Sequence, residues 1–595
     1  MTSSPVKLTM NKARKICLVA QISVYLWRSD PLFFNLQVIR RYPTLLRKYL
    51  LRALDSPLIP AGRKKPLWRA WIADLPDAGH QYLAQHRQSL VKLTRSEVAF
   101  ALAFQAEDCL PAGWQEKFPR AHLRYLWEIG DLEKLAELCE HPLDRGARAL
   151  AKKLTQQIRA LQISAPEPLA DFNRPSKAPS QVSYGQIRVL HFLTNSLPHT
   201  KSGYTHRSHE LNLAWQQAGI EPFVYTRLNY PLVIGSLFAT GVDQVDSITY
   251  HRLFAKKFDA DLTKQLQRTQ AQLKIAAKHH RVQLLHTTSN FQNAQVIAPL
   301  ARELNVPWTY EMRGFLELTW LSAMSIVRQE KAAHSTRFEL LRAQELNYMN
   351  DAAHVFTLSE TMKADLIRRG IPGEKISVTP NSVSPRLLEQ NLTVRQARGA
   401  LGLPQDGFWV GSVSSLVDYE GFEILLRAVA HLKANGLKVN CLLAGQGVSA
   451  GRLKALSSEL GIENQVFFPG ALPKKQAEVA FQALNIFVVP RNQTPVTSLV
   501  TPLKPIEAMA LARPIIVSEL APLTELTQAS NAGLTFSAQD WQRLGDRIQE
   551  LYDDETMCRE LAENGRRYAS ERSWANASKT YREVFEALLN GREPK

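Results

Sequence analysis

The chain has 595 residues, a formal net charge of +18, and 45% apolar and 22% charged side chains. This length exceeds what one hydrophobic core supports and predicts about three domains, and the composition excludes a disordered chain. The five cysteines are widely spaced and show neither C-x-x-C nor Cys/His metal spacing, which argues against structural zinc and for a reducing compartment. We therefore expect a cytoplasmic protein without a bound metal.

Apolar side chains recur at helical spacing from about Pro31 to Gln162, and residues 1–165 are expected to form an all-helical N-terminal domain. Within it, Leu126–Leu138 resembles one hairpin of a tetratricopeptide-type repeat, without a second copy at a fixed period. The longest apolar stretch near the N-terminus, Ile16 to Trp27, is shorter than the ~20 residues of a membrane span.

The positive charge is concentrated in this first region, where residues 1–100 hold 17 Lys and Arg against 5 Asp and Glu. One interpretation is recruitment of residues 1–165 to an anionic membrane surface, which would make the protein peripheral on the inner membrane face, or to a protein partner. The alternatives are a solvated basic surface with no charged partner and an extension that packs onto the catalytic part and completes its core. No nucleic-acid motif accompanies the basic residues, so a nucleic-acid partner is not expected.

A Pro/Ser-rich linker at residues 166–186 precedes two series of short β-rich runs that alternate with helical segments. The first series occupies residues 187–400 and the second residues 401–575, and residues 576–595 form a C-terminal helix and tail. The alternation predicts an α/β fold with two doubly wound, Rossmann-like domains that face each other across a cleft. Such domains bind ligands outside the carboxyl ends of their strands.

The segment from Val488 to Ala510 predicts a strand end, a loop and a helix at the cleft. Thr501 or Lys504 is expected to cap that helix, whose free N–H groups attract anions. Lys504 and Glu507 are three residues apart and share one helix face, which suits phosphate and ribose recognition, and Arg491 can supply a second cation. A helix with a surface Lys–Glu pair is the alternative interpretation.

This helix and the strand after it, Pro505–Ala510 and Arg513–Ser518, resemble the donor site of glycosyltransferase family 4. The resemblance covers residues 187 to about 590. Further segments that resemble the family are Gly445–Gly447, Phe468–Gly470, Thr379–Val383, Asp418–Gly421, Asn195–Tyr204 with Arg207, and Tyr310–Phe315.

The resemblance implies a GT-B fold, transfer with retention of the anomeric configuration, no cofactor and no bound metal. A nucleoside-diphosphate sugar is the implied co-substrate, and the acceptor is a glycan or a lipid-linked molecule. The only Asp-x-Asp, at Asp259 and Asp261, opens a polar helical run and not a strand-end loop. The implied donor-binding residues are Gly203, Tyr204, Ser415, Gly445, Gly447, Gly470, Arg491, Thr501, Lys504 and Glu507.

The chain departs from the family pattern at several positions. Thr288 stands where the family has the second histidine of a His-x-His pair, and Leu499 stands where a glutamate is usual. Ser415 and Glu420 take the places of a basic pair, and we infer that Arg491 and Lys504 supply that charge. Transfer with retention survives these changes if the leaving phosphate deprotonates the acceptor.

The expected catalytic residues are His286, Thr288, Arg313 and Glu507, and the expected acceptor ligands are Arg207, Arg313 and Glu317. A packed strand-end histidine is the alternative for His286, and an ordinary salt bridge is the alternative for Arg313 with Glu317.

We expect a transferase that builds a surface polysaccharide or lipid-linked glycan. The alternatives are a GT-B relative with other nucleotide-sugar chemistry, such as an epimerase or a phosphorylase, and a scaffold that keeps the fold without catalysis.

Overall fold

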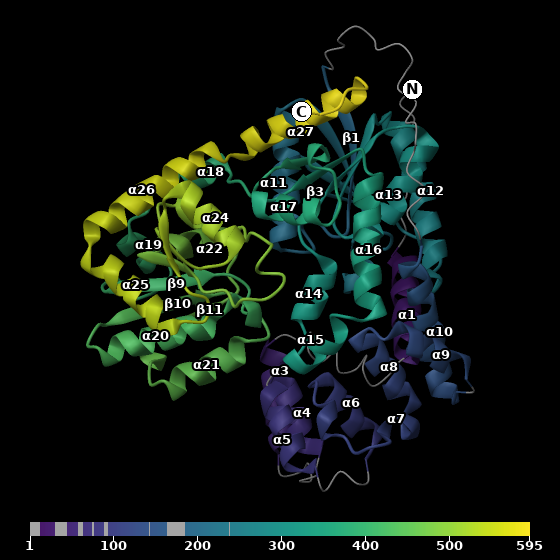
Figure 1. The fold of residues 1–595 in the computed structure, drawn as a ribbon, viewed down its shortest axis with the longest axis horizontal. Coiled ribbons are helices and arrows are strands. Elements are labelled where there is room, and N and C mark those ends of the chain that lie inside the picture. Colours follow the sequence, from purple (N-terminus) through teal and green to yellow (C-terminus); the bar gives the residue numbers. More distant parts are fainter. Residues whose placement is uncertain are drawn as a thin grey trace.

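The computed structural model describes residues 12–29, 44–56, 64–73, 76–87, 93–141, 143–163, 185–236 and 239–594. A helical N-terminal part precedes two domains that are each built on a sheet (Figure 1). The expected linker at 166–186 lies almost entirely outside the described residues. Within the described residues, no helix combines the length and apolar character that a membrane crossing requires.

The helical N-terminal part divides into two according to what it packs against. Trp71, Phe100 and Phe104 belong to a small core of their own, among helices α4 to α7. Leu126 of α8 and Leu154 of α10 instead join the core of the first sheet domain. Helices α8 to α10 therefore follow the alternative interpretation, that of a packed extension. The helices are α1 (Lys12–Ser29), α3 (Thr44–Asp55), α4 (Lys64–Ala73), α5 (Pro76–Gln85), α6 (Arg95–Ala103), η2 (Glu107–Cys109), α7 (Trp114–Lys117), α8 (Pro119–Ile129), α9 (Leu132–Glu140) and α10 (Arg145–Leu161).

The first sheet has eight strands in the order β3-β4-β2-β1-β5-β6-β7-β8, all parallel except for the antiparallel pair β3 and β4. Its central strands are buried along their whole length, as strands covered by helices on both faces must be. Its elements are β1 (Ile187–Leu193), α11 (Gly203–Gln217), β2 (Ile220–Thr226), η3 (Leu232–Ile234), β3 (Val242–Val245), β4 (Ile248–His251), α12 (Leu262–His280), β5 (Leu284–Thr288), α13 (Phe291–Leu304), β6 (Trp308–Glu311), α14 (Leu316–Ser322), α15 (Ile326–Ala332), α16 (Thr336–Asp351), β7 (His354–Thr357), α17 (Glu360–Arg368), η4 (Gly373–Lys375) and β8 (Ile376–Val378).

The second sheet has six parallel strands in the order β11-β10-β9-β12-β13-β14. Gly421 begins α20 with a φ of 69°, and a Cβ there would lie 1.9 Å from the Pro490 carbonyl oxygen, so only glycine fits this turn. The elements are α18 (Pro385–Leu388), α19 (Val394–Ala400), β9 (Phe408–Val413), η5 (Asp418–Glu420), α20 (Phe422–Ala434), β10 (Val439–Ala444), α21 (Ala450–Glu459), η6 (Glu463–Gln465), β11 (Val466–Gly470), α22 (Lys474–Gln482), β12 (Ile486–Val489), α23 (Lys504–Ala510), β13 (Ile515–Ser518), α24 (Ala521–Ser530), β14 (Gly533–Phe536), α25 (Trp541–Asp553) and α26 (Glu555–Glu571).

The last helix, α27 (Trp574–Leu589), returns from the second domain to the first (Figure 1). Its Tyr581 and Phe585 rings pack 5.3 and 5.5 Å from the ring of Trp215 in α11. Val383, where the chain first leaves the first domain, bridges to Ser573 just before α27. The chain thus crosses between the two domains twice, in two neighbouring segments. The expected fold class, two Rossmann-like domains after a helical region, is confirmed.

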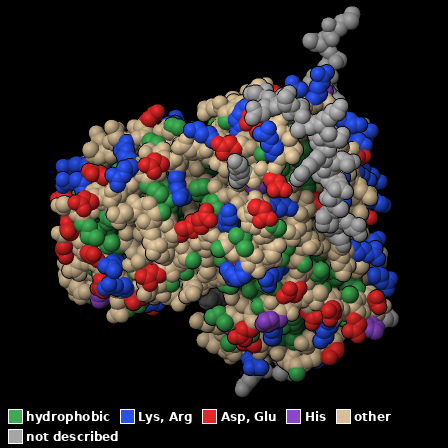
Figure 2. Space-filling model, turned by 45° about the horizontal axis from the view of Figure 1, so that its top comes forward, with side chains coloured by type: hydrophobic (Ala, Val, Ile, Leu, Met, Phe, Trp, Pro, Cys, Tyr) green, Lys and Arg blue, Asp and Glu red, His purple; other side chains and the backbone are tan. Residues whose placement is uncertain are grey.

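Acidic and basic side chains intermingle over the helical N-terminal part on the face that Figure 2 shows. Several of its basic residues, including Arg40, Arg41 and Arg63, lie outside the described residues. Among the described residues of this region, α8 to α10 pack against the first sheet domain, and recruitment to a membrane or a partner stays a prediction.

Candidate active site

The carboxyl ends of both sheets meet where α11 of the first domain faces α22 and α23 of the second. Lys474 at the start of α22 forms a 2.9 Å ion pair with Glu210 of α11. The side-chain amide of Asn381 donates to the Thr501 carbonyl oxygen at 3.1 Å. The loop before α23 also packs against the first domain's core through Val496, Leu499 and Val500.

The pair expected to read the nucleotide lies on one helix face. In α23 the Lys504 Nζ is 2.7 Å from Glu507 Oε2, and both side chains are partly exposed. The expected cap is wrong, because Leu503 occupies the N-cap position and no side chain caps the helix. Thr501 lies two residues further back, and its hydroxyl is buried without a hydrogen-bond partner. Pro505 occupies the first turn, as expected.

Arg491, the second expected phosphate cation, already has a carboxylate partner. Its Nη2 lies 2.6 Å from Glu420 Oε1, both side chains are nine-tenths buried, and its Nη1 donates to the Val500 carbonyl oxygen at 3.2 Å. Glu420 therefore neutralises the charge that we expected Arg491 to offer. The Nε of Arg491 is buried and has no hydrogen-bond partner.

Two basic side chains that the sequence analysis did not select lie near Lys504: His206 on α11 of the first domain and Lys474 on α22 of the second. Burial, and after it the nearby positive charges of Lys474 and Lys504, lower the pKa of His206 to about 4, so the ring is neutral at pH 7. The ring Nδ1 of His206 is buried without a hydrogen-bond partner. Lys474 and Lys504, which we call the cleft cations, therefore lie beside a neutral imidazole of the first domain. His206 stands between two motif residues, Tyr204 and Arg207, whereas no motif marks Lys474.

Gly203 and Tyr204 form the N-terminal turn of α11, close to His206 in the chain. Ser202 caps the helix in a capping box with Thr205, which fixes the turn. A Cβ on Gly203 would meet nothing within 4 Å, and Tyr204 is 53% exposed. Both expected donor residues are therefore accessible.

Gly445 and Gly447 are required by close packing between two loops. A Cβ on Gly445 would lie 1.8 Å from the Ser414 carbonyl oxygen, and one on Gly447 would lie 2.0 Å from that of Leu416. Ser415, between those two carbonyls, is exposed. Gly470 has a φ of 81°, the left-handed region that favours glycine.

Glu311, at the end of β6, pairs with both arginines of the acceptor side. Arg207 Nε donates to Glu311 Oε1 at 2.7 Å, and Arg313 Nη2 donates to Glu311 Oε2 at 2.6 Å. Burial would raise the pKa of Glu311, but Arg313 and Arg207 outweigh it and hold the pKa well below its usual value. The sequence analysis did not select Glu311, although it belongs to the segment Tyr310–Phe315.

The remaining hydrogen bonds of these arginines are structural. Arg313 donates to Ser208 Oγ at 2.7 Å and to the Tyr204 carbonyl oxygen at 3.2 Å, which holds the N-terminal turn of α11. Arg207 donates to the carbonyl oxygens of Thr379 and Pro380, where the chain leaves the first domain. This geometry fits positioning of the cleft better than direct acceptor contact.

His286 lies in an aromatic core. Its side chain is fully buried, its Nδ1 lies 2.8 Å from Thr309 Oγ1, and its ring packs 5.2 Å from that of Trp215. Burial lowers the pKa of His286, which keeps the ring neutral. The packed-histidine interpretation describes this arrangement, because the ring is enclosed and its Nε2 lies 3.5 Å from the buried Glu311 Oε2.

Two other expected residues also lie away from open solvent. Thr288 ends β5 and is 5% exposed. Glu317 in α14 is buried in a 2.8 Å ion pair with Arg369, not in the expected pair with Arg313, whose carboxylate partner is Glu311.

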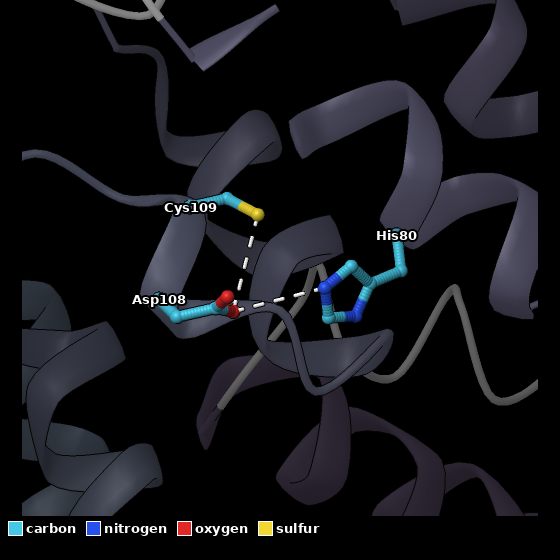
Figure 3. A group of neighbouring side chains, drawn as sticks. All are labelled: His80, Asp108 and Cys109. Carbon is cyan, nitrogen blue, oxygen red and sulfur yellow. Dashed lines mark hydrogen bonds and ion pairs between the residues drawn. The ribbon is translucent and has the colours of Figure 1, made fainter. Parts of the chain in front are cut away.

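Two places in the described structure contain carboxylates of the kind that can bind a metal. Asp261 accepts hydrogen bonds from the backbone N–H groups of Thr263 and Lys264 and caps α12, so its carboxylate is engaged at the start of that helix. His80, Asp108 and Cys109 gather in the N-terminal part, with His80 Nε2 3.8 Å from Asp108 Oδ1 (Figure 3). They are the only such group among the described residues, and they come from two segments whose spacing gave no metal signal.

Known proteins resemble both halves of this cleft. Residues 202–382 match the glycosyl transferase 4-like domain and residues 394–568 match the glycosyl transferases group 1, which together cover more than half of the chain. The chain belongs to the family 4 type of glycosyltransferases. The fold agrees with sucrose-phosphate synthase from Thermosynechococcus elongatus (TM-score 0.55, 22% identity, 67% of this chain and 100% of that chain). It also agrees with Anabaena Alr3699/HepE in complex with UDP (TM-score 0.53, 17% identity, 67% of this chain and 100% of that chain).

Curated relatives match this glycosyltransferase over shorter stretches. D-inositol 3-phosphate glycosyltransferase of Corynebacterium urealyticum is 28% identical over 200 residues, which are 32% of this chain and 46% of that protein. An uncharacterized glycosyltransferase of Methanocaldococcus jannaschii is 22% identical over 262 residues, 43% of this chain and 65% of that protein. The chain thus spans about half to two thirds of these relatives.

Proposed function

We propose that this glycosyltransferase moves a sugar, without a bound metal and with retention of the anomeric configuration, from a nucleoside-diphosphate sugar to a hydroxyl group of a glycan or lipid-linked acceptor. The observation that carries the proposal is the placement of the cleft cations, Lys474 and Lys504, on the second domain beside His206 of the first. Two ammonium groups, with an imidazole that a bound anion can help to protonate, suit a diphosphate, which carries its charge between the sugar and the nucleoside.

In this proposal the cleft cations stabilise the leaving diphosphate. The sugar–phosphate bond breaks, the acceptor oxygen bonds to the same face of the sugar, and the acceptor proton passes to a phosphate oxygen. Such a step needs orientation more than a protein base, so it accommodates Thr288 and the buried His286. Glu507, beside Lys504, accepts hydrogen bonds from the ribose hydroxyl groups.

The proposed setting is the cytoplasm, with a surface polysaccharide or lipid-linked glycan as product. The five cysteines are unpaired, which suits a reducing compartment. Attachment to the inner membrane face through the basic N-terminal region remains part of this proposal.

The test is turnover of uridine, guanosine and adenosine diphosphate-glucose in the presence of EDTA, without acceptor and with a mixture of lipid-linked and soluble glycans. We expect one nucleotide to be hydrolysed slowly without acceptor and faster with one, and the product linkage to keep the donor's configuration by nuclear magnetic resonance. No turnover of any of these donors would favour a scaffold that has lost catalysis.

A further inference from the structure

A pocket of about 270 Å³ opens between the helical N-terminal part and the first sheet domain. Trp127 of α8 and Gln157 of α10 line one side of this junction pocket, and Asn290, Gln292 and Trp320 line the other. Asn290 and Gln292 follow β5, and α14, which holds Trp320, follows β6. The pocket therefore lies at the carboxyl edge of the sheet, where domains of this kind bind their ligands.

Arg337, the first-turn arginine of α16, also lines the junction pocket. Its guanidinium carbon lies 4.2 Å from the ring centre of Trp127 and 4.7 Å from that of Trp320. Its Nη1 donates to the Trp127 carbonyl oxygen at 2.8 Å, while its Nε is buried without a partner. The two rings thus fix the orientation of the guanidinium plane but leave hydrogen-bond donors unused.

No carboxylate lies within 4 Å of the Arg337 guanidinium in the part of the chain that the structure describes. Burial lowers its pKa to about 10, with Glu128 as a weaker opposing influence, so it is still charged at neutral pH. The carboxylates nearby are engaged elsewhere, because Arg328 pairs with Glu107 at 2.8 Å and with Glu128 at 3.1 Å. An enclosed and unneutralised guanidinium is a site for an anion.

The rest of the lining suits a sugar ring. The side-chain amides of Gln157 and Gln292 make no hydrogen bond to other described residues, so they can pair with hydroxyl groups. The half-buried indoles of Trp127 and Trp320 provide apolar contact area, which sugar rings use on their C–H faces. A free inorganic ion would use the guanidinium alone and leave the amides and indoles without a role.

We propose that the junction pocket binds an anionic sugar unit, one that carries a carboxylate or phosphate, as part of the acceptor. The proposal rests on the proposed glycosyltransferase function and assigns the helical N-terminal part a role in acceptor recognition. Arg337 binds the anionic group, and Gln157 and Gln292 bind the ring hydroxyls.

The test uses the full chain and four probes: glucuronate, glucose 6-phosphate, glucose and inorganic phosphate. Binding is followed by saturation-transfer nuclear magnetic resonance and calorimetry. We expect the two anionic sugars to bind the unaltered protein about tenfold or more tightly than either glucose or phosphate, since hydrogen bonds to a charged group are involved. Equal binding of glucose and glucuronate, or of phosphate and glucose 6-phosphate, would overturn the proposal.

Variants then assign the effect to the pocket. Arg337→Gln should abolish the preference for anionic sugars, and Arg337→Lys should keep part of it. Arg342→Gln, on the same helix but outside the pocket lining, is the matched control and should keep all of it. An unchanged preference in a folded Arg337→Gln variant would contradict the assignment. Binding of nucleoside diphosphates, measured in parallel, should be unchanged; its absence in the unaltered protein would refute the proposed function without affecting the sugar result.

Discussion

Basic residues on the two sides of the cleft differ in their exposure and in their carboxylate partners. On the second domain, Lys504 and Lys474 keep partly exposed ammonium groups beside single carboxylates. On the first domain, Arg207 and Arg313 are buried and share the carboxylate of Glu311. Both sides of the cleft hold basic residues, but of these four only the lysines of the second domain are exposed to a ligand. A basic residue is a candidate ligand only when the local carboxylates leave its charge accessible.

The comparison also separates what the sequence could predict from what it could not. Strand and helix alternation predicted both sheets, because local periodicity reports burial. Lys504 and Glu507 were predictable because three-residue spacing fixes a shared helix face. The carboxylates that pair with the basic residues could not be predicted. Glu420 and Arg491, for example, are distant in sequence, and their contact depends on how the chain packs.

The acceptor side was harder to predict for the same reason. The packed environment of His286 comes from Trp215 and from α27, which are far from it in the chain. Likewise, the core that α8 to α10 share with the first sheet could not be inferred from a helical pattern, since periodicity shows that a face is apolar but not what covers it.

The largest predicted effect is a loss of stability of the first domain when the N-terminal part is removed. A fragment of residues 180–595 lacks Leu126, Leu154 and their neighbours, which exposes part of a shared core, so we expect it to be insoluble or to lose cooperative unfolding. A fragment that begins at residue 112 keeps α8 to α10 and serves as the control. A soluble fragment 180–595 with the thermal stability of the full chain would contradict the shared-core account.

Glu311→Gln tests the first domain's side of the cleft, where Arg207 and Arg313 are buried. The change leaves two buried arginines without their carboxylate, which should lower the free energy of unfolding by about 3–5 kcal/mol in urea titration. Because the folded-state pKa of Glu311 is lowered, its stabilising contribution exists above the unfolded pKa and is lost as the pH falls through the folded value. The control is Glu339→Gln, an exposed glutamate of α16, and a loss no greater than that of the control would show that Glu311 does not balance the arginines.

The accessible side is tested by Lys474→Ala. Loss of one cleft cation should weaken binding of a nucleoside-diphosphate sugar about tenfold in calorimetry, the effect of one charge-assisted hydrogen bond. The neighbouring Lys475→Ala is the matched control, since Lys475 is also exposed at the start of α22. Equal affinities for the two variants would remove Lys474 from the proposed site.

The pH dependence of binding should show a smaller effect. His206 has a pKa of about 4 in the unliganded protein, and a bound diphosphate would raise that pKa by attraction. Binding then takes up a proton, so the affinity for UDP-glucose should increase a few-fold as the pH falls from 7 to 5. In His206→Asn this increase should vanish; an identical pH profile in that variant would exclude His206 from the diphosphate site.

The central claim is that the donor binds on the second domain through α23, and one titration tests it most directly. The unaltered protein, Glu507→Ala and the exposed control Glu459→Ala are each titrated calorimetrically with the uridine, guanosine and adenosine diphosphate-sugars. We predict that one nucleotide binds the unaltered protein and the control equally, and binds Glu507→Ala at least about tenfold more weakly, because the ribose hydroxyls lose a charged acceptor. Equal affinity of all three proteins for every donor that binds would contradict the account.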